Sequence, residues 1–204
     1  MKKKAFIWTM LLTAMIIVTF SVATAPVKAD EVWKPLFGGS PHYYGDPGPK
    51  DPDWYFEHRT RVGDVHVWND GDSLYVTYYA YIWDCWVLTE THVAVAMFPT
   101  MDENGDGEIN ILDADIPQTK KGNPKVGRFP YKHEGLGGVA SDPYTIPLGS
   151  WGSGTTLIIA AHAVVENPCL DIEETAWTDC GGDDAYFRGN NWATYFTYTV
   201  QPVD

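Results

Sequence analysis

Oxygen-bearing side chains alternate along one short stretch of the chain, Asp102–Asp113. Asp, Asn and Asp occupy its first, third and fifth positions, and Gly107 follows at the sixth. Alternating carboxylate and amide oxygens can wrap around one cation, and the glycine permits the sharp turn that this wrapping requires. Calcium takes about six to eight oxygen ligands in flexible geometry. We therefore predict a calcium site in residues 102–113.

The spacing of this stretch resembles an EF-hand-type calcium loop, and its Asn and Asp choices are similar to those of dockerin domains. The resemblance implies a ligand set consisting of Asp102, Asn104, Asp106, the backbone carbonyl of Glu108, Asn110 and Asp113. Dockerins carry two such loops, each followed by a helix, and bind cohesins through both. This chain has one loop, and Pro117 prevents a long helix after it, so cohesin binding is not expected. The alternative is a solvated acidic loop without metal.

The N-terminal residues have the features of an export signal. Lys2, Lys3 and Lys4 precede an apolar run from Ala5 to Ala25, and residues 27–29 place small residues at the −3 and −1 positions of a cleavage site. We expect residues 1–29 to be a signal peptide and the mature protein to be secreted, at the cell surface or extracellular, without membrane insertion. The alternative is an uncleaved anchor, because the apolar run approaches the length of a bilayer crossing.

Removal of residues 1–29 leaves 10 basic and 27 acidic side chains, a net charge of −17. Such a surface repels nucleic acid and anionic lipid and attracts cations, so no nucleic-acid partner is expected. The 175 remaining residues suit one domain with a sizeable core. Abundant aromatic residues favour a packed protein over a disordered one.

Residues 30–60 are rich in proline and show no sustained periodicity, which predicts an extended N-terminal arm. From residue 61 onwards, alternating and β-branched runs predict strands at 64–68, 73–83, 87–98, 144–148, 155–165 and 191–200. The first two flank a tight turn and predict a hairpin, and 155–165 predicts a central strand buried on both faces. We predict an all-β fold for residues 61–204: an antiparallel β-sandwich, jelly-roll or Ig-like, of about seven to nine strands with the calcium loop inserted.

Six distinct motifs follow one another along the domain: ETHVAVA (90–96), IPQTKKGNPKVGRFPYKHE (116–134), YTIPL (144–148), IAAHAVVE (159–166), ETAW (174–177) and NWATYFTYTV (191–200). This succession resembles an uncharacterised β-sandwich domain of secreted bacterial and archaeal surface proteins. In that domain the AVA strand runs directly into the IPQTKKGNP segment, so the calcium loop looks like an insertion. The family has no assigned catalytic activity, so the resemblance implies fold and location only.

Cys85, Cys169 and Cys180 allow one disulfide and leave one thiol. Pairing of Cys169 with Cys180 would close a short loop, worth about 2–3 kcal/mol. Cys85 paired with either of them is the alternative. A buried free thiol at Cys85 and an intermolecular bridge both stay open.

His92 and His162, with Glu90 and Glu166 nearby, are candidates for a zinc or acid–base site. We favour core histidines that hydrogen bond to tyrosine hydroxyls or backbone. The sequence contains no Gly-x-Ser-x-Gly elbow, no HExxH pair and no phosphate-binding glycine loop. We therefore predict that the protein is not an enzyme.

Two functions fit these features. The first is an extracellular structural or adhesion subunit that associates with itself or another surface protein, as a calcium-dependent filament, tube or surface layer. Its arm would add a strand to a neighbour's open sheet edge, while calcium bridges acidic surfaces. The alternative is a carbohydrate-binding module whose exposed aromatic rings stack on a polysaccharide. Its candidate ligand-facing residues lie near predicted turns: Trp83, Trp86, Trp151 and Trp177.

Overall fold

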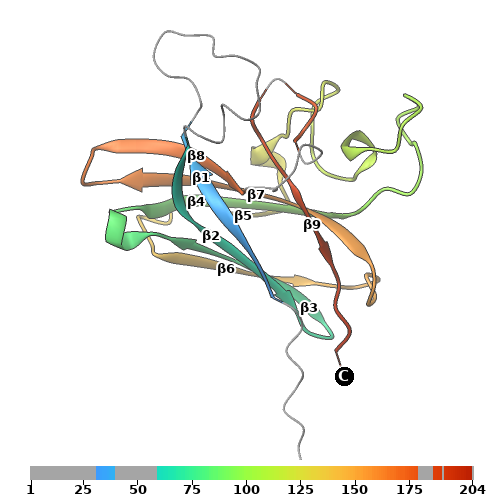
Figure 1. Ribbon diagram of the computed structural model, residues 1–204, viewed down its shortest axis with the longest axis horizontal. Coiled ribbons are helices and arrows are strands. Elements are labelled where there is room, and N and C mark those ends of the chain that lie inside the picture. The colour runs from blue at the N-terminus through green and yellow to red at the C-terminus, as the bar shows by residue number, and fades with distance from the viewer. Residues whose placement is uncertain (1–30, 40–58, 179–185, 190, 204) are drawn as a thin grey trace, which may run out of the picture.

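The computed structural model describes residues 31–39, 59–178, 186–189 and 191–203, and these residues form an all-β protein (Figure 1). Their strands are β1 (Val32–Gly38), β2 (Thr60–Asn69), β3 (Ser73–Ala80), β4 (Val87–Met97), β5 (Tyr131–His133), β6 (Ser141–Pro147), β7 (Thr156–Asn167), β8 (Ile172–Thr178) and β9 (Phe196–Thr199). The helical elements in these ranges are three single 3-10 turns, η1 (Ile82–Asp84), η2 (Ile111–Asp113) and η3 (Val126–Arg128). The predicted fold class is confirmed, whereas the predicted signal peptide lies outside the described residues.

The strands form one antiparallel sheet in the order β5-β4-β7-β8-β1-β2-β3-β6, and β9 pairs with β7. The sheet curls until its two ends meet. Leu88 of β4 pairs with Val139, which lies two residues before the start of β6. The Thr91 hydroxyl also lies within hydrogen-bond distance of Tyr144 on β6, at 2.6 Å. The two walls of the predicted sandwich are therefore parts of one nearly closed sheet (Figure 1).

The predicted hairpin is the β2–β3 pair, in register from Gly63 opposite Ala80 to Asn69 opposite Leu74. Asp70 shapes its turn because its carboxylate accepts from the backbone N–H of Asp72 and Ser73, at 2.9 and 2.7 Å. The predicted central strand is β7, which is flanked by β4 on one edge and by β8 and β9 on the other. Strands β5 and β8 have no counterpart in the sequence prediction.

Part of the predicted N-terminal arm belongs to the sheet, which corrects the boundary at residue 61. Residues 32–38 form β1, which pairs with β2 along its whole length and with β8 from Leu36 to Gly38. Leu36 is fully buried there. Residues 40–58, most of the remaining arm, lie outside the described residues, and Thr60 at its end begins β2.

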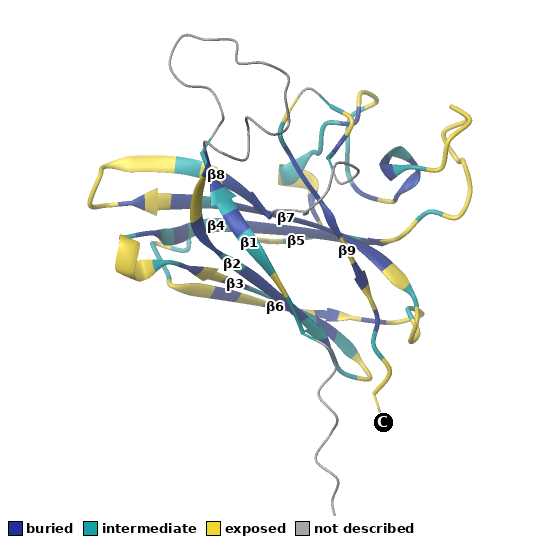
Figure 2. Ribbon diagram, viewed as in Figure 1, coloured by how far each residue is buried: buried dark blue, intermediate teal, exposed yellow. Residues whose placement is uncertain are grey.

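The described residues form two hydrophobic cores, one inside the curled sheet and one outside it. Most of the strand residues between them are buried (Figure 2). The inner core includes Leu36, Val65, Tyr78, Leu88 and Ile159. The outer core covers the other face of β4, β7 and β8 and includes Ala94, Ala96, Ile111, Ala114, Ile116, Phe129, Ile158, Ala160, Trp177, Phe187, Ala193 and Tyr195. The segment that contains the predicted calcium loop is therefore held to the sheet by apolar packing. No helix among the described residues combines the length and apolarity needed to span a membrane.

Candidate metal centre

The predicted calcium loop follows β4 and ends with η2, and packing fixes this C-terminal end. Ile111, the first residue of η2, is 3% exposed within the outer core. The side chain of Asn110 accepts from the Leu112 N–H and caps η2 at its N-terminus. The loop is therefore attached to the folded sheet directly beside its last two predicted ligands.

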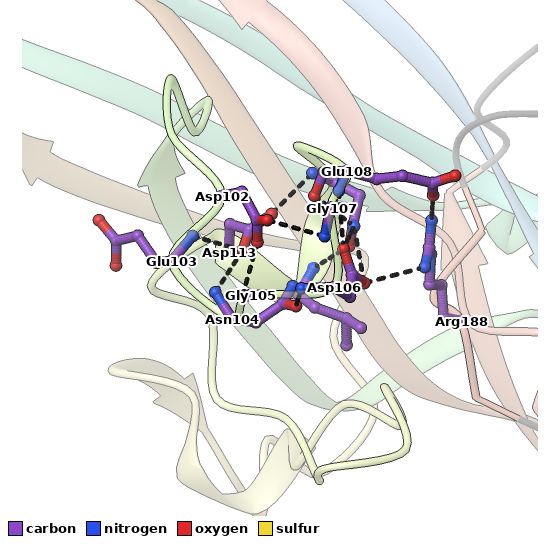
Figure 3. A network of polar contacts seen from close by, with 11 residues as sticks. Asp102, Glu103, Asn104, Gly105, Asp106, Gly107, Glu108, Asp113 and Arg188 are labelled. Atoms are coloured by element: carbon purple, nitrogen blue, oxygen red, sulfur yellow. Dashed lines mark hydrogen bonds and ion pairs between the residues drawn. The ribbon is translucent and has the colours of Figure 1, made fainter.

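Side-chain oxygens of the loop turn inwards and accept from the loop's own backbone (Figure 3). Asp102 accepts from the N–H groups of Gly105 and Gly107 at 2.7 and 2.8 Å. Asn104 accepts from Asp106 N–H, and Asp106 accepts from Glu108 N–H, both at 2.9 Å. Gly105 and Gly107 have φ values of 77° and 91°, a left-handed conformation that favours glycine. The alternation seen in the sequence thus produces a series of tight turns.

Asp113 closes the loop. Its Oδ1 accepts from the backbone N–H of Glu103 and Asn104 at 2.9 Å, and its Oδ2 accepts from Asn110 N–H at 2.8 Å. The hydrogen bond from Asn110, followed by those from Asn104 and Glu103, lowers the pKa of Asp113 because each favours the charged carboxylate. The twelfth position of the loop is therefore anionic and held beside the start of the loop.

The chemistry of the donor set fits a hard cation, because the predicted ligands are carboxylates, amides and one carbonyl within a single loop. Two features of the geometry differ from a finished calcium site. Asn110 turns its amide nitrogen towards the Glu108 carbonyl, at 2.9 Å, so its oxygen faces Leu112 instead. Among the described residues, no three His, Cys, Asp or Glu side chains are grouped as they would be around a metal ion. The loop therefore has the required ligands, and binding would require Asn110 to rotate and the carboxylates to converge.

Arg188 is a residue of this site that the sequence reasoning missed. Its guanidinium donates to Asp106 Oδ2 at 3.3 Å and to Glu108 Oε2 (Figure 3). The hydrogen bond with Glu108 is the largest cause of a raised pKa at Arg188. The backbone of Arg188 also packs against Gly122, where an added Cβ would lie 3.0 Å from the Arg188 Cβ. No local pattern signals this contact, because Arg188 is isolated in the sequence.

The chain matches no family model, no curated protein and no solved structure. Function therefore has to be argued from the arrangement of residues itself.

His92 and His162 face each other across β4 and β7, with their Nδ1 atoms 3.4 Å apart. Burial lowers the pKa of both and brings that of His162 to about 3, so the pair is neutral at physiological pH. Glu134, not Glu90 or Glu166, is the carboxylate that approaches His92, at 3.6 Å. When the His92 ring carries its proton on Nε2, which faces Glu134, the Nδ1 atom of His92 is free to accept a hydrogen bond from Nδ1–H of His162. This arrangement favours the interpretation of core histidines.

The four predicted ligand-facing tryptophans do not share one surface. Trp86 and Trp177 are each 5% exposed and belong to the two cores, which corrects the expectation for both. Trp151 is half-buried against the inner core. Trp83 is 75% exposed and stacks on Tyr81 with ring centroids 5.2 Å apart. Sandwich aromatics mostly fill cores, and two of these four do so.

A disulfide joins Cys85, after η1, to Cys169 in the β7–β8 turn, with Cα atoms 6.0 Å apart. This is one of the pairings that the sequence left open. Cys180 lies outside the described residues. The bridge spans 84 positions of sequence, and it therefore ties the connection after β3 to a turn in the second half of the chain.

Proposed function

We propose that the protein is a secreted calcium-binding β protein that acts outside the cell as a structural or adhesion subunit. The observation that carries the proposal is the loop 102–113, whose predicted ligands fold it into successive turns closed by Asp113. The charge of the mature chain supports it, because a net charge of −17 attracts cations. The Cys85–Cys169 bridge is typical of an oxidising compartment.

Aspartate at the twelfth position of the loop predicts modest affinity. Its side chain is one methylene shorter than the glutamate common there, so bidentate contact with an ion is harder. Sites of extracellular modules bind calcium with dissociation constants of about 10⁻⁴–10⁻³ M, which suits calcium levels outside cells. The role that we propose for the ion is to stabilise the loop on the outer core and to offset surface repulsion between subunits.

The position of β1 argues against assembly in which the N-terminal arm adds a strand to a neighbouring subunit. Residues 32–38 complete their own sheet between β2 and β8 instead of extending away from it. Addition of this strand to a neighbour would first require it to leave both partners. A contact between preformed surfaces is therefore the simpler route to assembly, and calcium would lower the repulsion that opposes it.

Calorimetric titration of the mature protein with calcium tests the proposal. Wild-type protein should bind one ion, and Asp102→Ala with Asp106→Ala should abolish the heat of binding. Glu103→Gln is the matched control, because Glu103 lies in the same loop but its carboxylate is not a predicted ligand. An unchanged binding isotherm in the double variant would contradict the assignment of Asp102 and Asp106 as calcium ligands.

A carbohydrate-binding role remains a second candidate, at a different surface from the one first expected. Trp33 is 52% exposed although one face of its ring is stacked on His66, with centroids 4.2 Å apart. Tyr79 lies beside it at 5.6 Å. Flat, exposed rings on a sheet are suited to stacking on sugars. Retention of wild-type protein, but not of Trp33→Ala, on insoluble polysaccharide would favour this function.

A further inference from the structure

At one end of the sheet, η1 and the β7–β8 turn form an exposed surface (Figure 2). Its side chains are both apolar and acidic. It consists of η1 with Cys85, and of the β7–β8 turn with its flanking residues, 166–173; we call it the acidic tip. Its exposed apolar side chains are Ile82, Trp83, Leu170 and Ile172, at 53, 75, 65 and 40%. Its exposed carboxylates are Asp84, Glu166, Asp171 and Glu173. These stretches contain no Lys, Arg or His.

Two bonds join the halves of the acidic tip and restrict their relative motion. The Cys85–Cys169 disulfide connects them, and Asn167 Nδ2 donates to the Asp84 carbonyl at 2.9 Å. The Asn167 Oδ1 also accepts from Cys169 N–H at 3.1 Å, within the turn. A surface that is already ordered loses little conformational entropy on binding. The tip is therefore prepared for docking.

An open cavity on the acidic tip indicates what it would accept. Its volume is about 360 Å³, and it is lined by Glu166, Asn167, Pro168, Asp171, Ile172 and Glu173. Three of these residues are acidic, and Pro168 and Ile172 supply apolar contact. Lysine and arginine combine an apolar stem with a cationic end, and both parts match this lining. The expected occupant is a basic, exposed segment of polypeptide.

Such a segment occurs elsewhere on the same chain. Between Ile116 and His133 there are five basic residues and no acidic one: Lys120, Lys121, Lys125, Arg128 and Lys132. They are half of the basic residues in the mature chain. Lys132 pairs with Glu134, whereas no ion pair with a described residue involves the other four. We call residues 120–132 the basic segment.

The basic segment is held in shape and lies away from the acidic tip. Thr119 N–H donates to the Asn123 carbonyl at 2.8 Å, and Phe129 anchors the segment in the outer core at 2% exposed. The segment packs beside residues 188–189, which lead towards β9, whereas the tip lies at the far end of β7 and β8 (Figure 1). Within one molecule the two surfaces are thus separate, and they remain available to other copies.

We propose that the acidic tip of one copy docks on the basic segment of a second copy. This proposal rests on the structural-subunit function and identifies its contact surfaces. The contact is heterologous, since different surfaces meet, and repetition of a heterologous contact builds a ring or an open filament. Calcium acts at a distance from this contact by lowering the overall repulsion between acidic subunits.

Charge reversal tests the proposal through light scattering of the mature protein in millimolar calcium. The tip variant is Asp84→Lys with Glu166→Lys and Glu173→Lys, and the segment variant is Lys120→Glu with Lys121→Glu and Lys125→Glu. Each variant alone should lose assembly, because its two surfaces then carry like charge. An equimolar mixture should recover assembly, because the reversed tip of one variant matches the reversed segment of the other. Asp72→Lys with Asp115→Lys, which changes the net charge in the same direction but outside the tip, should still assemble.

The outcomes separate this contact from the function on which it rests. Wild-type protein that assembles with calcium, together with variants that assemble equally well, overturns the docking contact and leaves the subunit function standing. Variants that fail alone and also fail when mixed overturn the contact as well. Wild-type protein that binds calcium and stays monomeric at high concentration overturns the subunit function and the contact with it.

Discussion

Arg188 and Glu108 form an ion pair although 80 residues separate them in the sequence. The same guanidinium reaches Asp106, so it fastens the middle of the predicted calcium loop to the segment that precedes β9. A cation of the protein itself therefore already contacts the side chain of one predicted calcium ligand. This contact makes Arg188 the first residue to test after the ligands.

Arg188→Gln should strengthen calcium binding about three- to tenfold, because it removes a positive charge next to the site. Exposed ion pairs contribute roughly 0.2–1 kcal/mol, so the midpoint of thermal unfolding should change little. Titration calorimetry measures the affinity, and Arg128→Gln, an exposed arginine that makes no ion pair with described residues, is the control. Weaker binding in Arg188→Gln would mean that the arginine holds the loop in its binding shape.

Calcium should raise the midpoint of thermal unfolding. An ion that binds only the folded protein stabilises it by about 2.7 kcal/mol when its concentration is a hundredfold above the dissociation constant. Melting curves in calcium and in chelator measure the effect, and Asp102→Ala with Asp106→Ala should remove it. Equal midpoints for the wild type in both solutions would count against a folding role for the ion.

The buried histidine pair predicts a loss of stability in acid. Burial lowers the pKa of His162 to about 3, below the value of about 6.5 expected in the unfolded chain. Between these values the unfolded chain binds more protons, so stability is complete above pH 6.5 and decreases as the pH falls towards 3. His162 alone contributes a slope of up to about 1.4 kcal/mol per pH unit.

His162→Phe keeps a ring beside Trp177 and removes the titrating group. Denaturant unfolding at several pH values should therefore show a shallower slope for this variant between pH 3 and 6.5. An identical slope in the variant and the wild type would show that other groups cause the acid dependence.

The disulfide should contribute substantially to stability, because it closes a long loop. For a separation of 84 positions the chain-entropy estimate is about 4.5 kcal/mol. Cys169→Ser should lower the free energy of unfolding by an amount of this order, as measured by denaturant titration without reductant. Cys180→Ser is the matched control and should retain the Cys85–Cys169 bridge. A similar loss in both variants would contradict the pairing.

Local patterns were enough to predict part of this fold. The β2–β3 hairpin and β7 follow from alternation, turn residues and an apolar run, all contained within a few neighbouring positions. The predicted calcium loop is equally local, because its side chains accept from backbone groups two to five residues away, apart from the closing Asp113. Such features need no knowledge of the rest of the chain.

Other elements depend on partners that are distant in sequence. β1 contains Pro35 and lacks a regular alternation, yet it pairs with β2 and supplies a buried leucine. β8 begins with Ile172-Glu173-Glu174, which resembles a polar loop until β7 pairs with it. Arg188 reaches the predicted calcium loop because residues 188–189 pack beside residues 122–123. Tertiary contacts decide these cases, and intrinsic propensity does not.

The position of β7, with neighbouring strands on both edges, determines how readily its backbone hydrogen bonds open. β4 pairs with it from Leu157 to Glu166, while β9 and β8 share its opposite edge. Its amide hydrogens are therefore exchanged with solvent only when the whole sheet opens. The backbone N–H groups of the loop 102–113 are bonded to side chains at the surface, so they exchange through small local openings. Backbone amides should therefore exchange slowly in the sheet and rapidly in the loop, and the two rates report separately on the stability of each part.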